Sequence, residues 1–278
     1  MTRALEVLAT GPLTTVQDAG RPGQAALGIG RSGVCDRSAY GLANRLVGNL
    51  PGAAVLEVTF GGLVLRAHGN LLLVTTGARC SGPWPHAAPT RLRDGEVLRL
   101  GPPVTGVRTF VAVRGGVDVP PVLGSRSTDL LAGLGPSVPA AGDLLPVGPA
   151  TGPLPNVDVA PVAEPAGGAV LLSVLPGPRR DWFDDAAWAR LRSRWEVTGE
   201  SNRVGLRLDG VPLERTTAGE LPSEGLVRGA VQMPPSGLPV LFLADHPVTG
   251  GYPVIAYVVD EDVDRAAQLR PGQGVALR

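Results

Sequence analysis

Glycine and proline constrain this chain more than any other feature of its sequence. There are 39 glycines and 28 prolines among 278 residues, well above the usage of an ordinary globular protein. Both residue types interrupt regular elements, so long helices and long strands are not expected. Hydrophobic residues nevertheless make up 44% of the chain, enough for a sizeable core. The combination predicts a mainly β fold built from many short strands and turns.

Short apolar runs that end at turn residues recur along the whole sequence and are typical of strands. Helical periodicity is found in only three segments, and Asp36 is placed to cap the first of them. The expected strands are 5–8, 71–76, 97–100, 109–113, 170–175, 228–233, 238–244 and 253–259, and the expected helices are 36–49, 184–194 and 262–269.

A proline- and glycine-rich stretch divides the chain into two parts of domain size. We therefore expect an N-terminal domain over residues 1–150, a linker over 151–168 and a C-terminal domain over 169–278.

Charge and lysine content exclude several classes of function. The 25 basic residues balance 25 acidic ones, so neither nucleic acid nor a membrane surface is an expected partner. No apolar run approaches the ~20 residues of a membrane span, and a cytoplasmic protein is expected. All basic residues are Arg. The chain therefore has no lysine that could carry biotin, form a Schiff base or complete a P-loop.

Two polar clusters stand out in the first half. In QDAGRPG, Asp18 and Arg21 form either a turn with a local ion pair or part of a site. LGSRSTDL is denser. Its Arg126, Ser127, Thr128 and Asp129 can bind a small carboxylate, or they can form a capped turn with a salt bridge. The sequence leaves both alternatives open.

The stretch GIGRSG, residues 28–33, matches the glycine pattern of dinucleotide-binding loops. No clear hydrophobic strand leads into Gly28, and strands and helices do not alternate, so we do not expect a dinucleotide fold. A glycine loop that brings backbone N–H groups near an anion is compatible with the pattern. Ser32 and Asp36 are the side chains that could accompany such a loop.

Further polar residues follow apolar runs in the second half, and loops converging on one groove would explain them. The scattered histidines and the absence of paired cysteines argue against a metal site. The candidate binding residues of this half are Asn202, Arg203, Gln232, Asp245, Thr249 and Tyr252.

Several segments, taken together and in order, resemble one family. They are LTTVQDAGRPG, GIGRSGVCD, ANRLVGN, LEVTFGG, GGVDVPPVLGSRSTDL, SNRVGLRL, GAVQMPPSGLPVLFLAD and TGGYPVIAYV. The chain resembles the family of the C subunit of bacterial ATP-dependent 5-oxoprolinase, also described as allophanate hydrolase subunit 2 or as biotin-dependent carboxyltransferase-like proteins. The sequence departs from this family at Cys35, at His246–Val248 and in the segment after Leu130.

The resemblance implies two cyclophilin-like β-barrels and a multi-subunit enzyme that uses ATP to open 5-oxo-L-proline to L-glutamate. Subunits A and B would be separate chains, ATP would bind mainly to a partner, and this chain would be inactive alone. Arg21, Arg126 and Arg203 would hold a carboxylate or developing phosphate charge. Asp18, Asp129 and Asp245 would polarise water or orient those arginines.

Two other functions agree with the same resemblance. One is a carboxyltransferase component of urea or allophanate metabolism, which would need a separate biotin carrier because this chain has no lysine. The other is a regulatory protein that antagonises a kinase inhibitor by docking to it.

Overall fold

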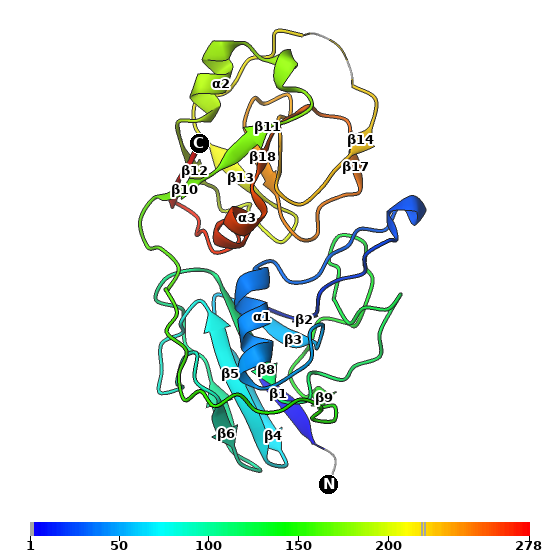
Figure 1. Cartoon of the computed structure of the whole chain (residues 1–278), viewed down its shortest axis with the longest axis vertical. Helices are drawn as coiled ribbons and strands as arrows, with labels where there is room; N and C mark the ends of the chain where they lie inside the picture. The colour runs from blue at the N-terminus through cyan, green and yellow to red at the C-terminus, as the bar shows by residue number, and fades with distance from the viewer. Residues whose placement is uncertain (1–2, 218, 220) are drawn as a thin grey trace. The chain divides into compact units, whose positions relative to one another are not determined.

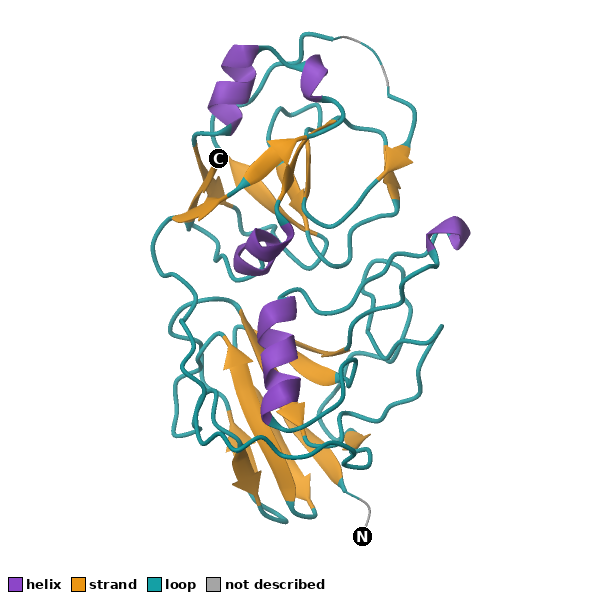
Figure 2. Ribbon diagram, in the orientation of Figure 1, coloured by secondary structure: helices purple, strands orange, loops and turns teal. Residues whose placement is uncertain are grey.

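A computed structural model describes residues 3–217, 219 and 221–278. The chain forms two compact units. The first consists of residues 1–21, 32–129 and 133–165, and the second of residues 22–31, 130–132 and 166–278. Strands far outnumber helices, which confirms the mainly β class (Figures 1 and 2).

The first unit contains two sheets whose strand orders are β7-β4-β1-β9 and β2-β3-β8-β5-β6. Among the described residues, both are open sheets with two edge strands. Their strands are β1 (Ala4–Thr10), β2 (Leu13–Gln17), β3 (Val55–Thr59), β4 (Leu63–His68), β5 (Leu71–Gly77), β6 (Thr90–Leu92), β7 (Val97–Arg99), β8 (Arg108–Val113) and β9 (Leu144–Pro146).

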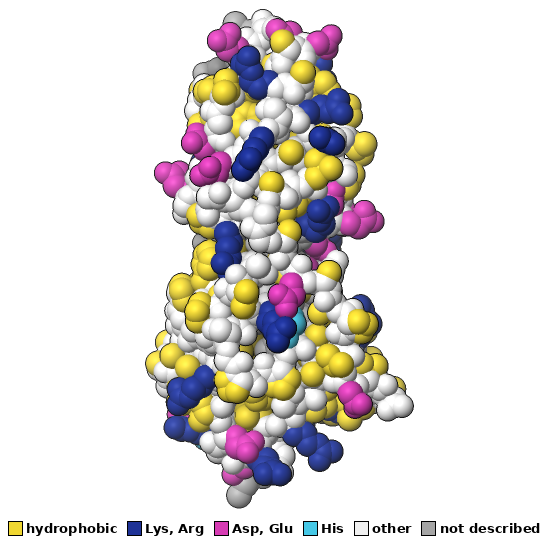
Figure 3. Space-filling view, turned by 90° about the vertical axis from the view of Figure 1, so that its left-hand side faces the viewer, with side chains coloured by type: hydrophobic (Ala, Val, Ile, Leu, Met, Phe, Trp, Pro, Cys, Tyr) yellow, Lys and Arg dark blue, Asp and Glu magenta, His cyan; other side chains and the backbone are white. Residues whose placement is uncertain are grey.

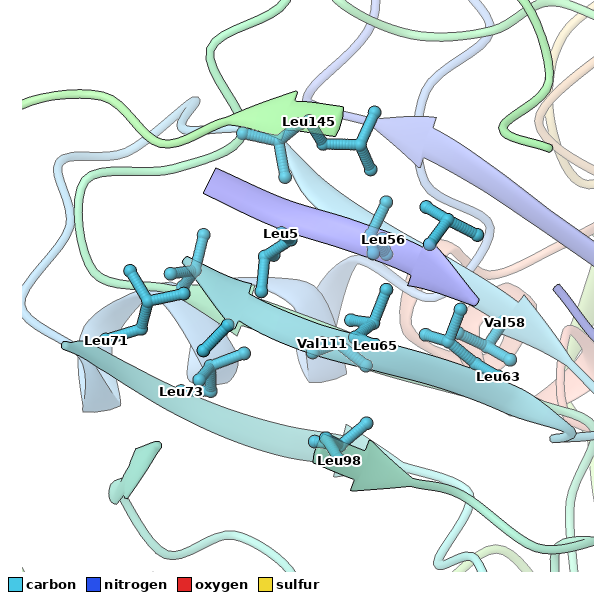
Figure 4. Packing of buried hydrophobic residues seen from close by; sticks show 14 of the residues in the cluster. Leu5, Leu56, Val58, Leu63, Leu65, Leu71, Leu73, Leu98, Val111 and Leu145 are labelled. Atoms are coloured by element: carbon cyan, nitrogen blue, oxygen red, sulfur yellow. The ribbon is translucent and has the colours of Figure 1, made fainter. Parts of the chain in front are cut away.

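Side chains from both sheets form the main core of this unit (Figure 4). Leu5 and Leu65 come from the first sheet, and Leu56 and Val111 from the second. Successive residues of a strand face opposite sides, so Val55, Val74 and Phe110 lie on the other face. On that outer face of the second sheet they pack with the helix α1 (Arg37–Leu46), which lies across the sheet in Figure 1.

The expected cap of this helix is confirmed. Asp36 has an extended backbone, and its side chain accepts a hydrogen bond from the backbone N–H of Ala39. This is the standard arrangement of an N-cap residue.

The second unit is built on an eight-stranded sheet with the order β10-β19-β12-β13-β16-β15-β18-β11 and a separate β14-β17 pair. Its elements are η1 (Ala25–Leu27), β10 (Val170–Leu172), β11 (Val174–Pro176), η2 (Arg180–Trp182), α2 (Asp185–Leu191), β12 (Arg194–Val197), β13 (Gly205–Asp209), β14 (Glu224–Gly225), β15 (Ala230–Gln232), β16 (Val240–Phe242), β17 (Thr249–Gly250), β18 (Val254–Val258), α3 (Asp260–Ala266) and β19 (Gly274–Leu277).

Two expected elements differ from the structure. The run 170–175 is not one strand, because β10 pairs with β19 and β11 pairs with β18. Between them, the backbone N–H of Ser173 donates to Asp262 at the start of α3. The expected helix 184–194 ends at Leu191, and Arg194 already belongs to β12, where it pairs with Ala276. Pairing with β19 replaces the last helical turn.

The predicted linker is held along the first unit as far as Pro165. Gly152 accepts a hydrogen bond from Arg114, Ala160 donates one to Ala87, and Glu164 forms an ion pair with Arg79. Ala166 then bonds to Gln273 of the second unit. The last passage from the first unit to the second therefore lies between Pro165 and Ala166.

Candidate functional site

Asp18 organises the main polar cluster of the first unit. It follows β2 directly and is buried. Its Oδ1 accepts from the hydroxyls of Ser125 and Ser127 at 2.6 and 2.7 Å and from the N–H of Gly20 at 2.8 Å. Its Oδ2 accepts from the N–H of Arg126 at 2.6 Å. These four hydrogen bonds to one carboxylate tie the loop after β2 to residues 125–127.

Ser127 bonds to Asp18 in both directions. The backbone N–H of Asp18 donates to the Ser127 hydroxyl at 2.9 Å, and that hydroxyl donates to the Asp18 carboxylate. Thr128 continues the same contact, because its N–H donates to the carbonyl of Val16 at the end of β2. The two motifs singled out in the first half, QDAGRPG and GSRSTD, are therefore parts of one cluster.

Arg21 is fully buried in this cluster. Its Nη2 donates to the Ser127 carbonyl at 2.5 Å, and its Nη1 lies 3.6 Å from the Asp129 carboxylate. Among the residues that the structure describes, Nε and Nη1 have no hydrogen-bond partner. A buried guanidinium with unsatisfied donors is uncommon in proteins. Arg21 therefore combines an ion-pair contact to Asp129 with two donors, Nε and Nη1, that make no hydrogen bond.

Arg126 points away from the cluster. Its guanidinium is one-third exposed, at 33%, and bonds to Asp118 and to the carbonyl of Val119. Only its backbone N–H contacts Asp18. Residues 125 and 127 face inward while residue 126 faces outward, as neighbours do in extended backbone. The expected role of Arg126 in catalysis remains a prediction.

Ser32 and Asp36 belong to a segment that packs against the Asp18 loop. Ser32 is buried with a positive φ of 52°, and the N–H of Val34 donates to the carbonyl of Asp18 at 3.1 Å. At Gly33, with φ of 94°, a Cβ atom would lie 2.9 Å from the nitrogen of Gly20. Only glycine permits this close approach of two backbones.

A buried acid that the sequence did not single out lies beneath this segment. Glu57 of β3 accepts from the N–H of Cys35 at 2.9 Å and lies 3.4 Å from Nε of Arg108. Both side chains are buried. An acid within the apolar run VLEVT is the signal that could have identified it. Glu57 therefore fixes the backbone at Cys35, just before α1 begins.

The pKa of Tyr40, on α1, is also affected by burial and by Asp18. Its hydroxyl donates to the carbonyl of Ala53 at 3.0 Å. Burial, and then the negative charge of Asp18, raise the pKa of Tyr40 well above its ordinary value. The phenol therefore stays neutral and remains a donor.

In the second unit, Arg203 and Asp245 form a buried ion pair. Nε and Nη2 of Arg203 lie 2.9 and 3.0 Å from the two carboxylate oxygens. Arg203 lies just before β13 and Asp245 just after β16, and these strands are neighbours. The N–H of Leu130 also approaches Asp245, at 3.4 Å. The two-point geometry fixes both side chains.

The remaining candidates of the second unit are spread over a wider area. Gln232 is buried and donates to the carbonyl of Tyr252 at 3.0 Å, while the ring of Tyr252 is 44% exposed. Thr249 is exposed in β17. Asn202 forms a turn, since its side chain accepts from the N–H of Val204. The candidates of this half thus form one ion pair and a separate Gln232–Tyr252 contact.

The predicted site residues are therefore divided between the two units. The first unit holds Ser32, Asp36 and the cluster around Asp18, and the second holds the Arg203–Asp245 pair with Gln232 and Tyr252. That loops from both halves line one groove remains a prediction. On the face shown in Figure 3, basic and acidic side chains are interspersed with apolar ones.

The glycine loop 28–33 does not have the setting of a nucleotide site. Gly28 follows the 3₁₀ turn η1, and within the described residues no strand leads into it. A phosphate-binding glycine loop needs a strand before it and a helix directly after it. Within the described residues, the loop 28–33 therefore lacks the strand–loop–helix setting of a dinucleotide-binding site.

Comparison with known proteins relates this arrangement to one family. The model of the carboxyltransferase domain, subdomain A and B, matches residues 27–278. The chain is 38% identical to the C subunit of 5-oxoprolinase from Escherichia coli (strain K12), over 98% of this chain and 89% of that protein. It is 31% identical to the C subunit of 5-oxoprolinase from Haemophilus influenzae, with the same coverage.

Similarity extends to proteins of urea metabolism. The chain is 33% identical to urea amidolyase of Lachancea kluyveri, over 98% of this chain but only 17% of that protein. The crystal structure of K. lactis urea amidolyase superimposes with a TM-score of 0.89 at 27% identity, over 99% of this chain and 18% of that one. No helix among the described residues is long and apolar enough to cross a membrane. The chain belongs to the carboxyltransferase domain family, subdomain A and B.

Proposed function

We propose that this chain is a non-autonomous subunit of an ATP-dependent 5-oxoprolinase, which opens 5-oxo-L-proline to L-glutamate. One observation carries the proposal: the chain matches two proteins named as the C subunit of 5-oxoprolinase over 89% of their length. The urea amidolyase match covers only 17% of that protein. The similarity thus extends over most of each C subunit but over only one part of urea amidolyase.

The contacts support different roles for the polar residues. Asp18 and Asp245 are each occupied by buried donors, so they orient loops and Arg203 rather than activate water. Arg21 has unused donors in a buried environment, where a hydrogen bond to an anion is strong. Holding and orienting the substrate is therefore the contribution that this chain can make.

ATP would be bound mainly by the partner subunits A and B. This chain has no lysine, and its glycine loop follows a 3₁₀ turn rather than a strand. Both facts support a division of labour in which this chain is inactive alone. The partner chains, the cyclic amide substrate and the use of ATP are all parts of the proposal.

A carboxyltransferase role in urea or allophanate metabolism is the second candidate. The 33% identity to urea amidolyase of Lachancea kluyveri favours it. Because the chain has no lysine, biotin would have to be presented by another protein.

Assays with each substrate in turn separate the two candidate functions. The chain is purified with both partner subunits and assayed with ATP and 5-oxo-L-proline, with ATP, bicarbonate, urea and a biotinylated carrier, or with allophanate. We expect glutamate from 5-oxo-L-proline only. Turnover of urea or allophanate alone would support the second candidate, and tight partner binding without any turnover would support a regulatory protein.

A further inference from the structure

Two buried side chains of the first unit, four residues apart, have unsatisfied hydrogen-bonding atoms of opposite kind. Arg21 has the donors Nε and Nη1, and Gln17 has the acceptor Oε1, and none of the three has a hydrogen-bond partner among the described residues. Both side chains are at most 1% exposed. An unsatisfied polar atom in such a place is destabilising, so a ligand that satisfies both kinds would be bound favourably.

The orientation of Gln17 is determined by its contacts. Its Nε2 donates to the carbonyl of Thr128 at 2.8 Å and to the hydroxyl of Thr15 at 3.0 Å. A carbonyl only accepts, so the amide nitrogen must face Thr128, and Oε1 must be the free atom.

Arg21 and Gln17 bond to the carbonyls of two successive residues. Nη2 of Arg21 bonds to the carbonyl of Ser127, while Gln17 bonds to the carbonyl of Thr128. Gly135 covers Arg21 from another side, since a Cβ at that glycine would lie 3.1 Å from Nη2 and 2.0 Å from the Ser127 carbonyl oxygen.

We propose that Arg21 and Gln17 form a subsite for a compound that carries a carboxylate next to an amide N–H. Arg21 binds the carboxylate, and Gln17 Oε1 accepts the N–H. In 5-oxo-L-proline the ring N–H and the carboxylate are attached to adjacent atoms, so one small molecule presents both groups. This inference rests on the proposed function and names the residues that recognise its substrate.

Binding measurements test the subsite without requiring turnover. Calorimetry on the assembled complex compares 5-oxo-L-proline with pyrrolidin-2-one, which has the ring N–H but no carboxylate. The wild-type complex should prefer 5-oxo-L-proline by on the order of 10- to 100-fold, the effect of a charged hydrogen bond. Arg21→Met should bring this ratio close to one while leaving the affinity for pyrrolidin-2-one unchanged.

Additional variants separate recognition from folding. Arg21→Lys keeps the charge and should retain part of the preference, while Gln17→Met should weaken both compounds by a similar factor. Arg66→Met is the control, because Arg66 lies on β4 and pairs with Glu6 at the surface. A partly unfolded protein would lose affinity for both compounds equally and would not change the ratio.

Three results would overturn the subsite. They are an unchanged ratio in Arg21→Met, no preference in the wild-type complex, and a crystal structure with 5-oxo-L-proline in which Arg21 and Gln17 contact ordered water only. If 5-oxo-L-proline binds through Arg21 but the complete complex produces no glutamate, the subsite stands and the proposed function fails.

Discussion

Replacing Asp18 with Asn tests whether this carboxylate holds the two loops of the first unit together. An Asn side chain can keep its oxygen at the position of Oδ1, where three donors converge. Its NH₂ group then faces the N–H of Arg126, which now bonds to Oδ2 at 2.6 Å. The NH₂ group and the N–H of Arg126 are both donors, so neither would be satisfied in this buried position. Rotating the amide by 180° would instead place the NH₂ group against the three donors at the Oδ1 position.

The expected loss follows from these contacts. One charge-assisted hydrogen bond, worth ~1.5–3 kcal/mol, disappears, and a buried N–H remains unsatisfied. We expect the free energy of unfolding to fall by about 3 kcal/mol, measured by urea denaturation. Hydrogen exchange should increase in peptides that contain Gly20 and residues 125–127, because these residues donate to the Asp18 carboxylate.

The matched control is Asp118→Asn. Asp118 is half-exposed and accepts from the side chain of Arg126. Loss of this ion pair should lower the free energy of unfolding by no more than ~1 kcal/mol. If Asp18→Asn is no more damaging than Asp118→Asn, or if exchange increases uniformly over the chain, the assignment of Asp18 as the centre of the cluster is wrong.

Three further changes address other parts of the structure. Gly33→Ala should cost about 3 kcal/mol, since its Cβ meets the backbone of the Asp18 loop, whereas Gly52→Ala has a similar φ and open space and should cost about 1 kcal/mol in the same urea denaturation. Arg203→Met should cost about 3–5 kcal/mol because Asp245 stays buried without its partner, and a double-mutant cycle with Asp245→Leu should recover part of the loss. The raised pKa of Tyr40 contributes stability that is fully present below pH ~10 and lost as the pH rises above it, so Tyr40→Phe should make the urea midpoint less dependent on pH above ~10; an unchanged pH dependence would contradict this.

Local features of the fold could be predicted because they depend on neighbouring residues. Asp36 is followed three residues later by the N–H that it caps, and the run TFVAV became part of β8. The division of 170–175 into two strands could not be predicted, since the partners of β10 and β11 come from residues near 276 and 257.

The site was predictable as two separate motifs but not as one cluster. Asp18 and Ser127 are 109 residues apart, and no local pattern shows that they are in contact. Arg126 is the basic residue of its motif, which suggests an anion-binding role, yet its side chain pairs with Asp118 at the surface. Glu57 was missed because its importance depends on Cys35 and Arg108, which come from other elements.

The most direct test of the account is the rate of ATP-dependent glutamate formation from 5-oxo-L-proline by the chain together with subunits A and B, measured with each chain omitted in turn. We predict glutamate from the complete set and none when this chain is left out or assayed alone. An unchanged rate without this chain, or no glutamate from a complete and stably assembled set, would contradict the proposed function.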